Sequence, residues 1–349
     1  MISLCLAIET SCDDTSVALV GADGFVHSLV SANQDLAHAP FGGIVPEIAG
    51  RNHSLHLLPL IEQIFKKSGK TWKDVGGIAV TNRPGLIGSL IVGVVTAKSL
   101  AQVHKLKLIG VNHLEGHILA PFLRDADYSP SFSFDEPFLA LAVSGGHTSL
   151  YQVDELEKYQ ILGATLDDAA GEAFDKFGKM LGFEFPGGVK VDRTARSGNP
   201  KAFDFPRSMI KEDNFLMSFS GLKASGQRMI ESMGLEKAKA QAPDLCASFQ
   251  EAIVDILIAK LDRAVVQTGI QNVVITGGVS ANSRLREQSE KWAKRKHVNL
   301  QIPPLEYCTD NAAMIGYAGI LRLNKNQSSP LSLGPAPHSL AHDFIGEGL

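Results

Sequence analysis

The chain has 349 residues, 44% of them hydrophobic, which is typical of a globular protein large enough for two domains and excludes a disordered chain. Its four cysteines lie far apart with no CxxC pair, so a disulfide framework or a cysteine zinc knot is not expected. The formal net charge of -4 means that a nucleic-acid partner would need a local basic patch or help from another subunit.

The N-terminus has no basic n-region and acidic residues come early, so neither a signal nor a transit peptide is expected. The longest apolar runs are broken by glycines and are too short to span a bilayer. We therefore expect a cytoplasmic protein that has no membrane contact.

The first third of the chain predicts a sheet with helices. Apolar, alternating segments between polar turns indicate strands, and apolar residues at helical spacing indicate helices. The expected strands are residues 3–9, 15–21, 25–31, 76–82 and 107–113. The expected helices are residues 45–69 and 85–105, the second apolar nearly all round and therefore buried.

Residues 124–137 are polar, contain two prolines, and form the expected domain boundary. After them the opening pattern of three strands recurs in residues 137–165, followed by a helix in residues 166–182. Farther on, residues 247–269 indicate a long amphipathic helix, and residues 271–293 indicate a strand, a glycine turn and a helix. The sequence thus predicts an α/β protein of two similar halves, with ligands in a cleft between the lobes.

The expected domains are 1–128 and 129–324, and a Pro- and Ser-rich tail, 325–349, is expected to pack back on the first.

Two glycine turns follow apolar strands, in "VSGGHT" and in "ITGGVSANSRL". Glycine lets backbone N–H groups approach a phosphate closely, and a helix N-terminus favours an anion. Neither turn is a P-loop or a GxGxxG fingerprint. Ordinary turn glycines are the alternative interpretation.

The segment "GVNHLEGHILAPF" places His113 and His117 four residues apart, on one face of a helix, where both imidazoles can reach one metal ion. A zincin-type protease is not expected, because the position after the first histidine is Leu114 and Glu115 lies on roughly the opposite face. A packed histidine pair without a metal is the alternative.

A third ligand would have to come from elsewhere, and Asp310 lies in a loop after an apolar strand and before a helix. Asp310 could equally be a plain helix N-cap, and Glu306 and Cys308 compete with it as ligands.

Three acids, Asp168, Glu172 and Asp175, share one predicted helix face, which would suit ribose hydroxyls, a metal or plain solvation. The basic run in residues 283–297 indicates a solvated helix face or part of an RNA-facing patch.

Ten segments occur in an order that resembles one family. They are "IETSCDDTSVAL", "VPEIAGRNH", "PGLIGSLIVG", "VNHLEGHI", "VSGGHT", "DDAAGEAFDK", "PGG", "SFSGLK", "GGVSANSRLR" and "CTDNAAMIGYAG". Together they resemble the TsaD family of tRNA N6-adenosine threonylcarbamoyltransferases, formerly called O-sialoglycoprotein endopeptidases, over residues 4–322. The segment "DDAAGEAFDK" resembles the sequences of the bacterial and organellar branch of the family.

The resemblance implies an actin-like, sugar-kinase-like fold of two duplicated lobes around a cleft. It implies one divalent ion, Fe²⁺ or Zn²⁺, on His113, His117 and Asp310, and allows Mg²⁺ with ATP. The implied substrate-binding residues are Ala142, Val143, Ser144, Gly145 and Gly146 around a phosphate, and Asp175, Gly188, Asp192 and Asn282 around the adenosine.

The implied reaction moves the threonylcarbamoyl group from threonylcarbamoyl-AMP to N6 of adenosine 37 in tRNAs reading ANN codons, and releases AMP. Glu9, Asp13 and His147 are the candidates for a general base, since they lie nearest the polar and glycine turns in sequence. The alternative function is a nucleotide-binding ATPase or scaffold subunit of a tRNA-modification complex.

Implied partners are tRNA, a TsaB-like and a TsaE-like protein, or a second copy of the chain, with the adenylate supplied by TsaC. The helices in residues 45–65 and 86–101 carry more apolar surface than one lobe needs, which would suit a subunit interface or simple core packing. The chain departs from the family pattern at Arg83, at Val189 and in "SFSGLKAS".

Overall fold

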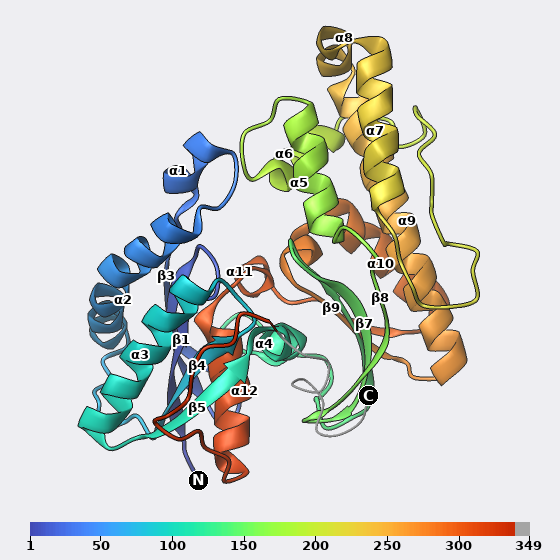
Figure 1. Ribbon diagram of the computed structural model, residues 1–349. Coiled ribbons are helices and arrows are strands. Elements are labelled where there is room, and N and C mark those ends of the chain that lie inside the picture. Colours follow the sequence, from blue (N-terminus) through green and yellow to red (C-terminus); the bar gives the residue numbers. More distant parts are fainter. Residues whose placement is uncertain (339–349) are drawn as a thin grey trace. The chain divides into compact units, whose positions relative to one another are not determined.

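The computed structural model describes residues 1–338, and the chain forms two compact units (Figure 1). Among the described residues, the first lobe comprises Met1–Ser133 and 303–338, and the second lobe is Phe134–Ile302. The predicted boundary after residue 128 lies near the observed one. The assignment of residues 303–324 to the second lobe is wrong, because helix α12 (Ala312–Asn324) packs on the sheet of the first lobe.

The sheet of the first lobe has the strand order β3-β2-β1-β4-β5. Its first three strands form an antiparallel meander, and β4 and β5 continue it in parallel with β1. The strands are β1 (Leu4–Glu9), β2 (Thr15–Gly21), β3 (Val26–Ala32), β4 (Gly77–Arg83) and β5 (Lys107–Asn112), close to the predicted ranges.

Helices cover both faces of this sheet. Successive residues of a strand point to opposite faces, so Leu6 and Ile8 pack in one core with α2 (Pro46–Ser68) and α3 (Ile87–His104). On the other face α12 approaches closely, because a Cβ at Gly319 would lie only 2.3 Å from the Cβ of Ala79. The short helices of this lobe are α1 (Asp35–His38), α4 (His113–Leu119) and α11 (Leu305–Cys308), with 3-10 turns η1 (Ala39–Phe41) and η2 (Ala120–Phe122).

The second lobe repeats this topology with the order β10-β9-β6-β7-β8, so the predicted duplication is confirmed. Again three antiparallel strands are followed by two parallel ones. The strands are β6 (Phe138–Val143), β7 (Thr148–Glu155), β8 (Lys158–Ala164), β9 (Asn272–Thr276) and β10 (Asn299–Gln301).

The helices of the second lobe pack around the buried α9 (Figure 1). α9 begins at Ala242, earlier than the predicted residue 247, since Pro243 suits the first turn of a helix. Gly188 lies in the first turn of α6, a helix that the sequence did not predict, and its N–H donates to the Asp175 carboxylate. The helices are α5 (Ala170–Met180), α6 (Gly187–Ala195), α7 (Ser220–Met233), α8 (Leu235–Ala240), α9 (Ala242–Thr268) and α10 (Ser283–Lys296), with 3-10 turn η3 (Gly278–Ala281).

The described part of the tail runs over the first lobe. The Ser329 N–H donates to the Leu108 carbonyl (2.7 Å), and the Ala336 N–H donates to the Asn82 carbonyl (2.8 Å). Lys98 Nζ donates to the Leu333 carbonyl at 3.0 Å. The tail predicted to pack on the first lobe also includes residues 339–349, which lie outside the described residues.

One described helix, α3, is long and apolar enough to cross a membrane by length and composition. In the structure it packs against β4 and α2 as a helix of the first lobe.

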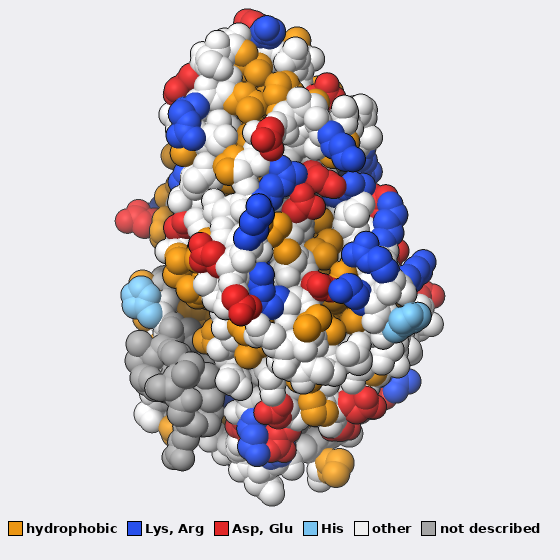
Figure 2. Space-filling model, turned by 90° about the vertical axis from the view of Figure 1, so that its right-hand side faces the viewer, with side chains coloured by type: hydrophobic (Ala, Val, Ile, Leu, Met, Phe, Trp, Pro, Cys, Tyr) orange, Lys and Arg blue, Asp and Glu red, His pale blue; other side chains and the backbone are white. Residues whose placement is uncertain are grey.

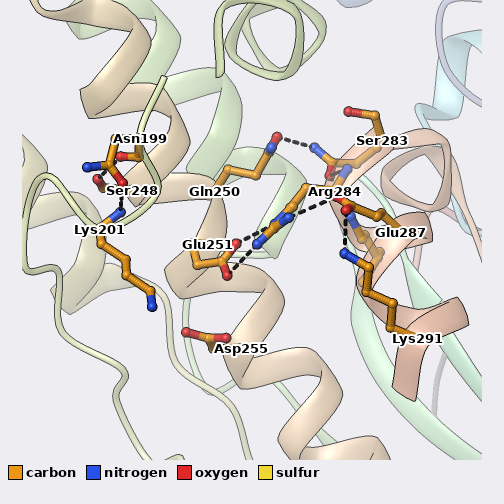
Figure 3. A network of polar contacts seen from close by, with 12 residues as sticks. Asn199, Lys201, Ser248, Gln250, Glu251, Asp255, Ser283, Arg284, Glu287 and Lys291 are labelled. Atoms are coloured by element: carbon orange, nitrogen blue, oxygen red, sulfur yellow. Dashed lines mark hydrogen bonds and ion pairs between the residues drawn. The ribbon is translucent and has the colours of Figure 1, made fainter. Parts of the chain in front are cut away.

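At least three of the six Lys and Arg side chains in the basic run of residues 283–297 form ion pairs, and Arg284 is one of them. Lys291 contacts Glu287 at 2.6 Å, and Lys296 contacts Asp262 at 2.8 Å. Figure 2 shows Lys and Arg side chains interspersed with Asp and Glu on the face that it presents. This arrangement, to which the contacts of Arg284 and Lys291 with Glu287 in Figure 3 also belong, is typical of a solvated, ion-paired surface.

Candidate functional site

The histidine pair owes its geometry to a helix cap at the end of β5. The Asn112 side chain accepts from the Leu114 N–H at 2.9 Å, which is a regular N-cap contact. α4 therefore begins at His113, and His117 follows one turn later on the same face. Both side chains are buried, and their rings lie edge to face with centroids 4.6 Å apart.

Asp310 completes this group. Its Oδ1 lies 3.1 Å from His117 Nε2 and 3.3 Å from His113 Nε2. The interpretation of Asp310 as a plain N-cap is wrong, because the neighbouring Asn311 caps α12 by accepting from the Met314 N–H at 3.0 Å.

The potential ligand atoms of His113, His117 and Asp310 all lie within 4.8 Å of one another. This is the metal-ligand group found among residues 1–338, and it includes neither Glu306 nor Cys308.

Glu9, at the end of β1, fixes the orientation of His113. Its Oε2 lies 3.0 Å from His113 Nδ1 and accepts from Thr81 Oγ1 at 2.5 Å, while Oε1 accepts from the Ser11 N–H. An imidazole that donates from Nδ1 to a carboxylate presents Nε2 to a metal. Glu9 was predicted as a candidate base from its place in the sequence, and in the structure both of its oxygens accept hydrogen bonds.

The electrostatics of the group suit a cation. Burial alone would lower the pKa of His113, but the Asp310 and Glu9 carboxylates outweigh it and raise that pKa well above its usual value. Burial would raise the pKa of Asp310, but His113 outweighs it and holds that pKa well below the usual range. The buried Glu9 carboxylate and the partly exposed Asp310 carboxylate thus draw a positive charge into the group. Two imidazole nitrogens and one carboxylate oxygen form a donor set suited to iron or zinc.

Glu115 has a structural role on the other side of α4. Its side chain is 1% exposed, and its two oxygens lie 3.2 and 3.1 Å from the Arg322 guanidinium of α12. This bidentate pair ties together the helix that carries the two histidines and the helix that follows Asp310. The prediction that Glu115 points away from the histidine face agrees with this contact.

Replacing Glu9 with glutamine is expected to weaken metal binding by about 10- to 100-fold, the usual effect of losing a carboxylate that orients a histidine ligand. The amide oxygen of the new side chain could still accept from His113, so the fold should persist. Competition with a chelator of known affinity would measure the metal affinity, with far-UV circular dichroism as the control. Wild-type affinity in a folded variant would contradict the role of Glu9.

The first glycine turn of the second lobe joins β6 to β7. The Ser144 N–H donates to the His147 carbonyl (2.8 Å), and the His147 N–H donates to Ser144 Oγ (3.1 Å). A Cβ built on Gly145 or Gly146 would meet no atom within 4 Å. Open space therefore lies against this backbone, as a bound phosphate requires.

The second glycine turn lies at the same edge of the sheet. β6 and β9 are parallel neighbours with Ala142 opposite Thr276, so both turns leave the sheet side by side. Gly277 has φ +88°, and a Cβ there would lie 2.5 Å from the Val143 carbonyl oxygen, so only glycine fits this close approach. The N-terminus of α5 also reaches the first turn, since the Gly171 N–H donates to the Ser144 carbonyl at 3.2 Å.

The residues predicted to hold adenosine lie in the second lobe, in two hydrogen-bonded groups. Asp175 Oδ1 accepts from the Gly188 N–H at 2.7 Å. Asp192 Oδ1 accepts from the Ser283 N–H at 3.0 Å and from its hydroxyl at 2.7 Å. Asn282, the residue before Ser283, is the N-cap of α10.

Asp168 and Glu172 do not join this set. Lys176 contacts Asp168 at 3.2 Å and Glu172 at 2.6 Å, and Lys223 also contacts Asp168. The helix face predicted from these acids is therefore mostly ion-paired, and only Asp175 turns toward α6.

The two other candidate bases lie in different lobes. Asp13 follows β1 in the first lobe, where burial raises the pKa of its carboxyl. His147 lies in the first glycine turn of the second lobe.

A family model described as "TsaD: tRNA N6-adenosine threonylcarbamoyltransferase" matches residues 26–317. The chain belongs to the TsaD family. A tRNA N6-adenosine threonylcarbamoyltransferase of Bdellovibrio bacteriovorus is 65% identical, over 99% of this chain and all of that protein. A protein of the same name from Geotalea uraniireducens is 45% identical, over 96% of this chain and 95% of its own length. The resemblance inferred from the ordered segments is thus confirmed.

Solved structures share the fold at low sequence identity. Full-length HypF in a phosphate- and nucleotide-bound form has a TM-score of 0.61 at 13% identity, covering 93% of this chain and 56% of that one. Component A of (R)-2-hydroxyglutaryl-CoA dehydratase from Acidaminococcus fermentans has a TM-score of 0.51 at 13% identity, covering 91% and 99%. These likenesses support the predicted fold of two actin-like lobes.

Proposed function

We propose that this chain transfers the threonylcarbamoyl group of threonylcarbamoyl-AMP to N6 of adenosine 37 in tRNAs that read ANN codons, releasing AMP. Membership of the TsaD family supports the reaction class. The observation that carries the proposal is the group of His113, His117 and Asp310, which lie far apart in the sequence and which the fold brings within 4.8 Å.

The acceptor amine is a poor nucleophile because its lone pair is delocalised into the adenine ring. The carbamoyl carbonyl must therefore be activated, and negative charge on the departing phosphate must be stabilised. A divalent cation held by His113, His117 and Asp310, iron or zinc by the chemistry of the donors, would supply Lewis acidity and a template for the reacting groups.

The chain's own residues perform the remaining tasks in this proposal. Glu9 holds the His113 ring in place through Nδ1. The Ser144–Gly146 backbone receives the phosphate through its N–H groups, in the open space beside Gly145 and Gly146. Asp175, Gly188, Asp192 and Asn282, with Ala142 and Val143 at the end of β6, are proposed to position the adenosine. Asp13 and His147 remain the proposed candidates for the proton acceptor.

We propose that a TsaB-like protein or a second copy of the chain covers the outer side of α2 and α3. Leu55 and Leu58 on α2 are 68% and 58% exposed, and Ile91 and Val95 on α3 are 45% and 54% exposed. Ile91 and Val95 are four residues apart and share one helix face, and α2 packs against α3. Exposed apolar side chains on neighbouring helices are typical of protein interfaces. A TsaE-like protein and the cytoplasm as the working compartment belong to the same proposal.

The test compares two tRNA transcripts that differ only at position 37, adenosine or guanosine, with threonylcarbamoyl-AMP and the candidate partner proteins. AMP release that needs adenosine 37 is the expected result. The alternative function, a nucleotide-gated ATPase or scaffold, predicts instead that ATP is hydrolysed without tRNA and that the two transcripts behave alike. If the chain has this alternative function, its ligand would be ATP together with Mg²⁺.

Changing Gly145 to valine is expected to weaken AMP binding by about tenfold or more, because the side chain would fill the space in which backbone donors meet a phosphate. The fold should tolerate the change, since a Cβ at Gly145 meets nothing within 4 Å. Isothermal titration calorimetry with AMP gives the affinity. Gly43→Val is the matched control, because a Cβ added at Gly43 would also meet nothing within 4 Å and Gly43 lies in the first lobe. Equal affinities in both variants would count against the phosphate site.

A further inference from the structure

The turn between β1 and β2, residues 10–14, lies against the candidate metal group of the first lobe. Ser11 Oγ lies 3.2 Å from Nδ1 of His113. Two positions farther along, burial raises the pKa of the Asp13 carboxyl, and the nearby Asp310 carboxylate raises it further. The turn therefore lies beside two of the three candidate ligands, and its shape decides where the Asp13 carboxylate is presented.

The backbone of this turn is fixed by two helices that pack against each other, α2 and α3 (Figure 1). Both donate to the same atom, since the Cys12 carbonyl oxygen lies 3.0 Å from His53 Nε2 of α2 and accepts from the Ser89 hydroxyl of α3 at 3.2 Å. The chain that leads into α3 also approaches closely, because a Cβ at Gly85 would lie 2.5 Å from the Ser11 carbonyl oxygen. The turn thus depends on contacts with residues far away in the sequence.

The hydrogen bonds around His53 define its protonation state. A carbonyl oxygen only accepts, so Nε2 carries the hydrogen that Cys12 receives. The side chain is fully buried and burial lowers its pKa, so the ring is neutral and Nδ1 is an acceptor.

Nδ1 of His53 receives hydrogen bonds from its own side of the ring. The Thr15 hydroxyl donates to it at 2.7 Å, and Gln34 Nε2 lies 3.5 Å from it. The Gln34 amide is oriented by Asn52, whose Nδ2 donates to Gln34 Oε1 at 3.1 Å. Both ring nitrogens are therefore engaged inside the protein, so His53 acts on the turn and not on a substrate.

We propose that His53 is a positioning residue for the transfer reaction, which holds the Cys12 carbonyl so that the turn presents the Asp13 carboxylate beside Asp310. The inference rests on the proposed function, since it assigns the turn to that reaction. Without His53, Ser89 alone would donate to a carbonyl that is enclosed between two helices. The loss of a donor to such a carbonyl favours other conformations of the turn, and a small displacement of a reacting group lowers the rate strongly.

The thiol of Cys12 reports the conformation of the turn independently of the reaction. Cys12 is half-buried, whereas the other three cysteines of the chain are buried. Labelling of the full-length chain with a thiol reagent, located by peptide mass spectrometry, therefore reads this one position. Burial and the Asp13 carboxylate raise the pKa of the Cys12 thiol, so labelling of wild type is expected to be slow.

The variant His53→Leu, which cannot donate, is expected to label at Cys12 about fivefold or more faster than wild type, because one hydrogen bond no longer holds the turn. His53→Gln is expected to restore most of the wild-type rate, since its amide nitrogen can donate to the same carbonyl. His56→Leu, the same change at an exposed position of α2, is the matched control and should label as wild type does.

The transfer reaction and the metal content are measured on the same preparations. His53→Leu is expected to lower kcat about tenfold or more, with the metal content and the KM for threonylcarbamoyl-AMP close to wild type, because the phosphate and adenosine residues belong to the second lobe. His53→Gln should recover most of kcat. A residue needed only for folding would not give this separation of kcat from KM and metal content.

Two results would overturn the proposal: a folded His53→Leu variant that labels at the wild-type rate, or one that labels faster and still transfers at the wild-type rate. If His53→Leu does not fold, His53→Asn replaces it with the same expectations, because its shorter amide does not reach the carbonyl. Transfer by wild type together with either result removes the role of His53 and leaves the proposed function intact. Labelling that depends on His53 in a chain that transfers nothing contradicts the proposed function and, with it, the reaction assigned to the turn.

Discussion

Replacing His113 and His117 together with alanine is expected to remove the bound metal and to lower the rate of threonylcarbamoyl transfer at least about a hundredfold. Lewis-acid activation is worth several kcal/mol, and each 1.36 kcal/mol of barrier is a factor of about ten in rate. The variant leaves Asp310 without either imidazole, so one carboxylate alone would have to hold the ion. Metal content by inductively coupled plasma mass spectrometry and the initial rate of transfer are measured on the same sample.

The matched control for this double variant is His27→Ala with His56→Ala, two exposed histidines of the same lobe. The control should keep the wild-type metal content and rate. A double variant at positions 113 and 117 that still carries one metal ion per chain would show that the ligands lie elsewhere. Loss of metal with an unchanged rate would separate the metal from the reaction.

Replacing Arg322 with alanine is expected to lower the free energy of unfolding by about 3–5 kcal/mol, because it leaves the buried Glu115 carboxylate without its cationic partner. The Glu115 side chain is 1% exposed and meets Arg322 through both oxygens. The loss should fall on the first lobe, where α4 and α12 would no longer be tied together. Urea unfolding followed by circular dichroism measures the change.

The double variant Glu115→Leu with Arg322→Met tests the cause of that loss. Removing both charges leaves no unpaired carboxylate, so most of the stability should return. A single Arg322→Ala variant within about 0.5 kcal/mol of wild type, the range of an ordinary surface substitution, would contradict this account of the pair.

The sequence predicted much of the fold because its strands alternate and end at recognisable turns. In both halves, three strands separated by polar turns precede a helix, and each meander appears in the structure with two parallel strands added to it. α6 was not predicted, because its start depends on a carboxylate from α5, Asp175, that accepts from the Gly188 N–H across a gap of 13 positions. Local sequence patterns carry no record of such a contact.

The lobe assignment of α12 was wrong for a related reason. In the sequence, α12 follows directly after the second half of the chain, so it was assigned to that half. Its glycines indicate close packing against a sheet. Gly316 and Gly319 allow it to lie against Ala7 and Ala79 of the first sheet. The sequence shows that Gly316 and Gly319 are three positions apart and share one face of this helix. Such a face indicates close packing against a sheet, but it does not indicate which of the two sheets.

The candidate metal group was predicted in part from spacing and in part from family resemblance. Two histidines four apart can share a metal on any helix, whereas Asp310 could not be told from a helix cap by sequence alone. Asn311 decides the question, because it is the residue that caps α12. Glu9 was identified as a candidate for a different role, since its contact with His113 joins positions 104 apart.

Nucleoside mass spectrometry on tRNA digested after the reaction tests the central claim most directly. Purified chain is incubated with unmodified tRNA, isotopically labelled threonylcarbamoyl-AMP and the candidate partner proteins. The account predicts labelled N6-threonylcarbamoyladenosine with wild type and little or none with the His113→Ala, His117→Ala variant. Unmodified adenosine from wild type, with every partner present, would contradict it.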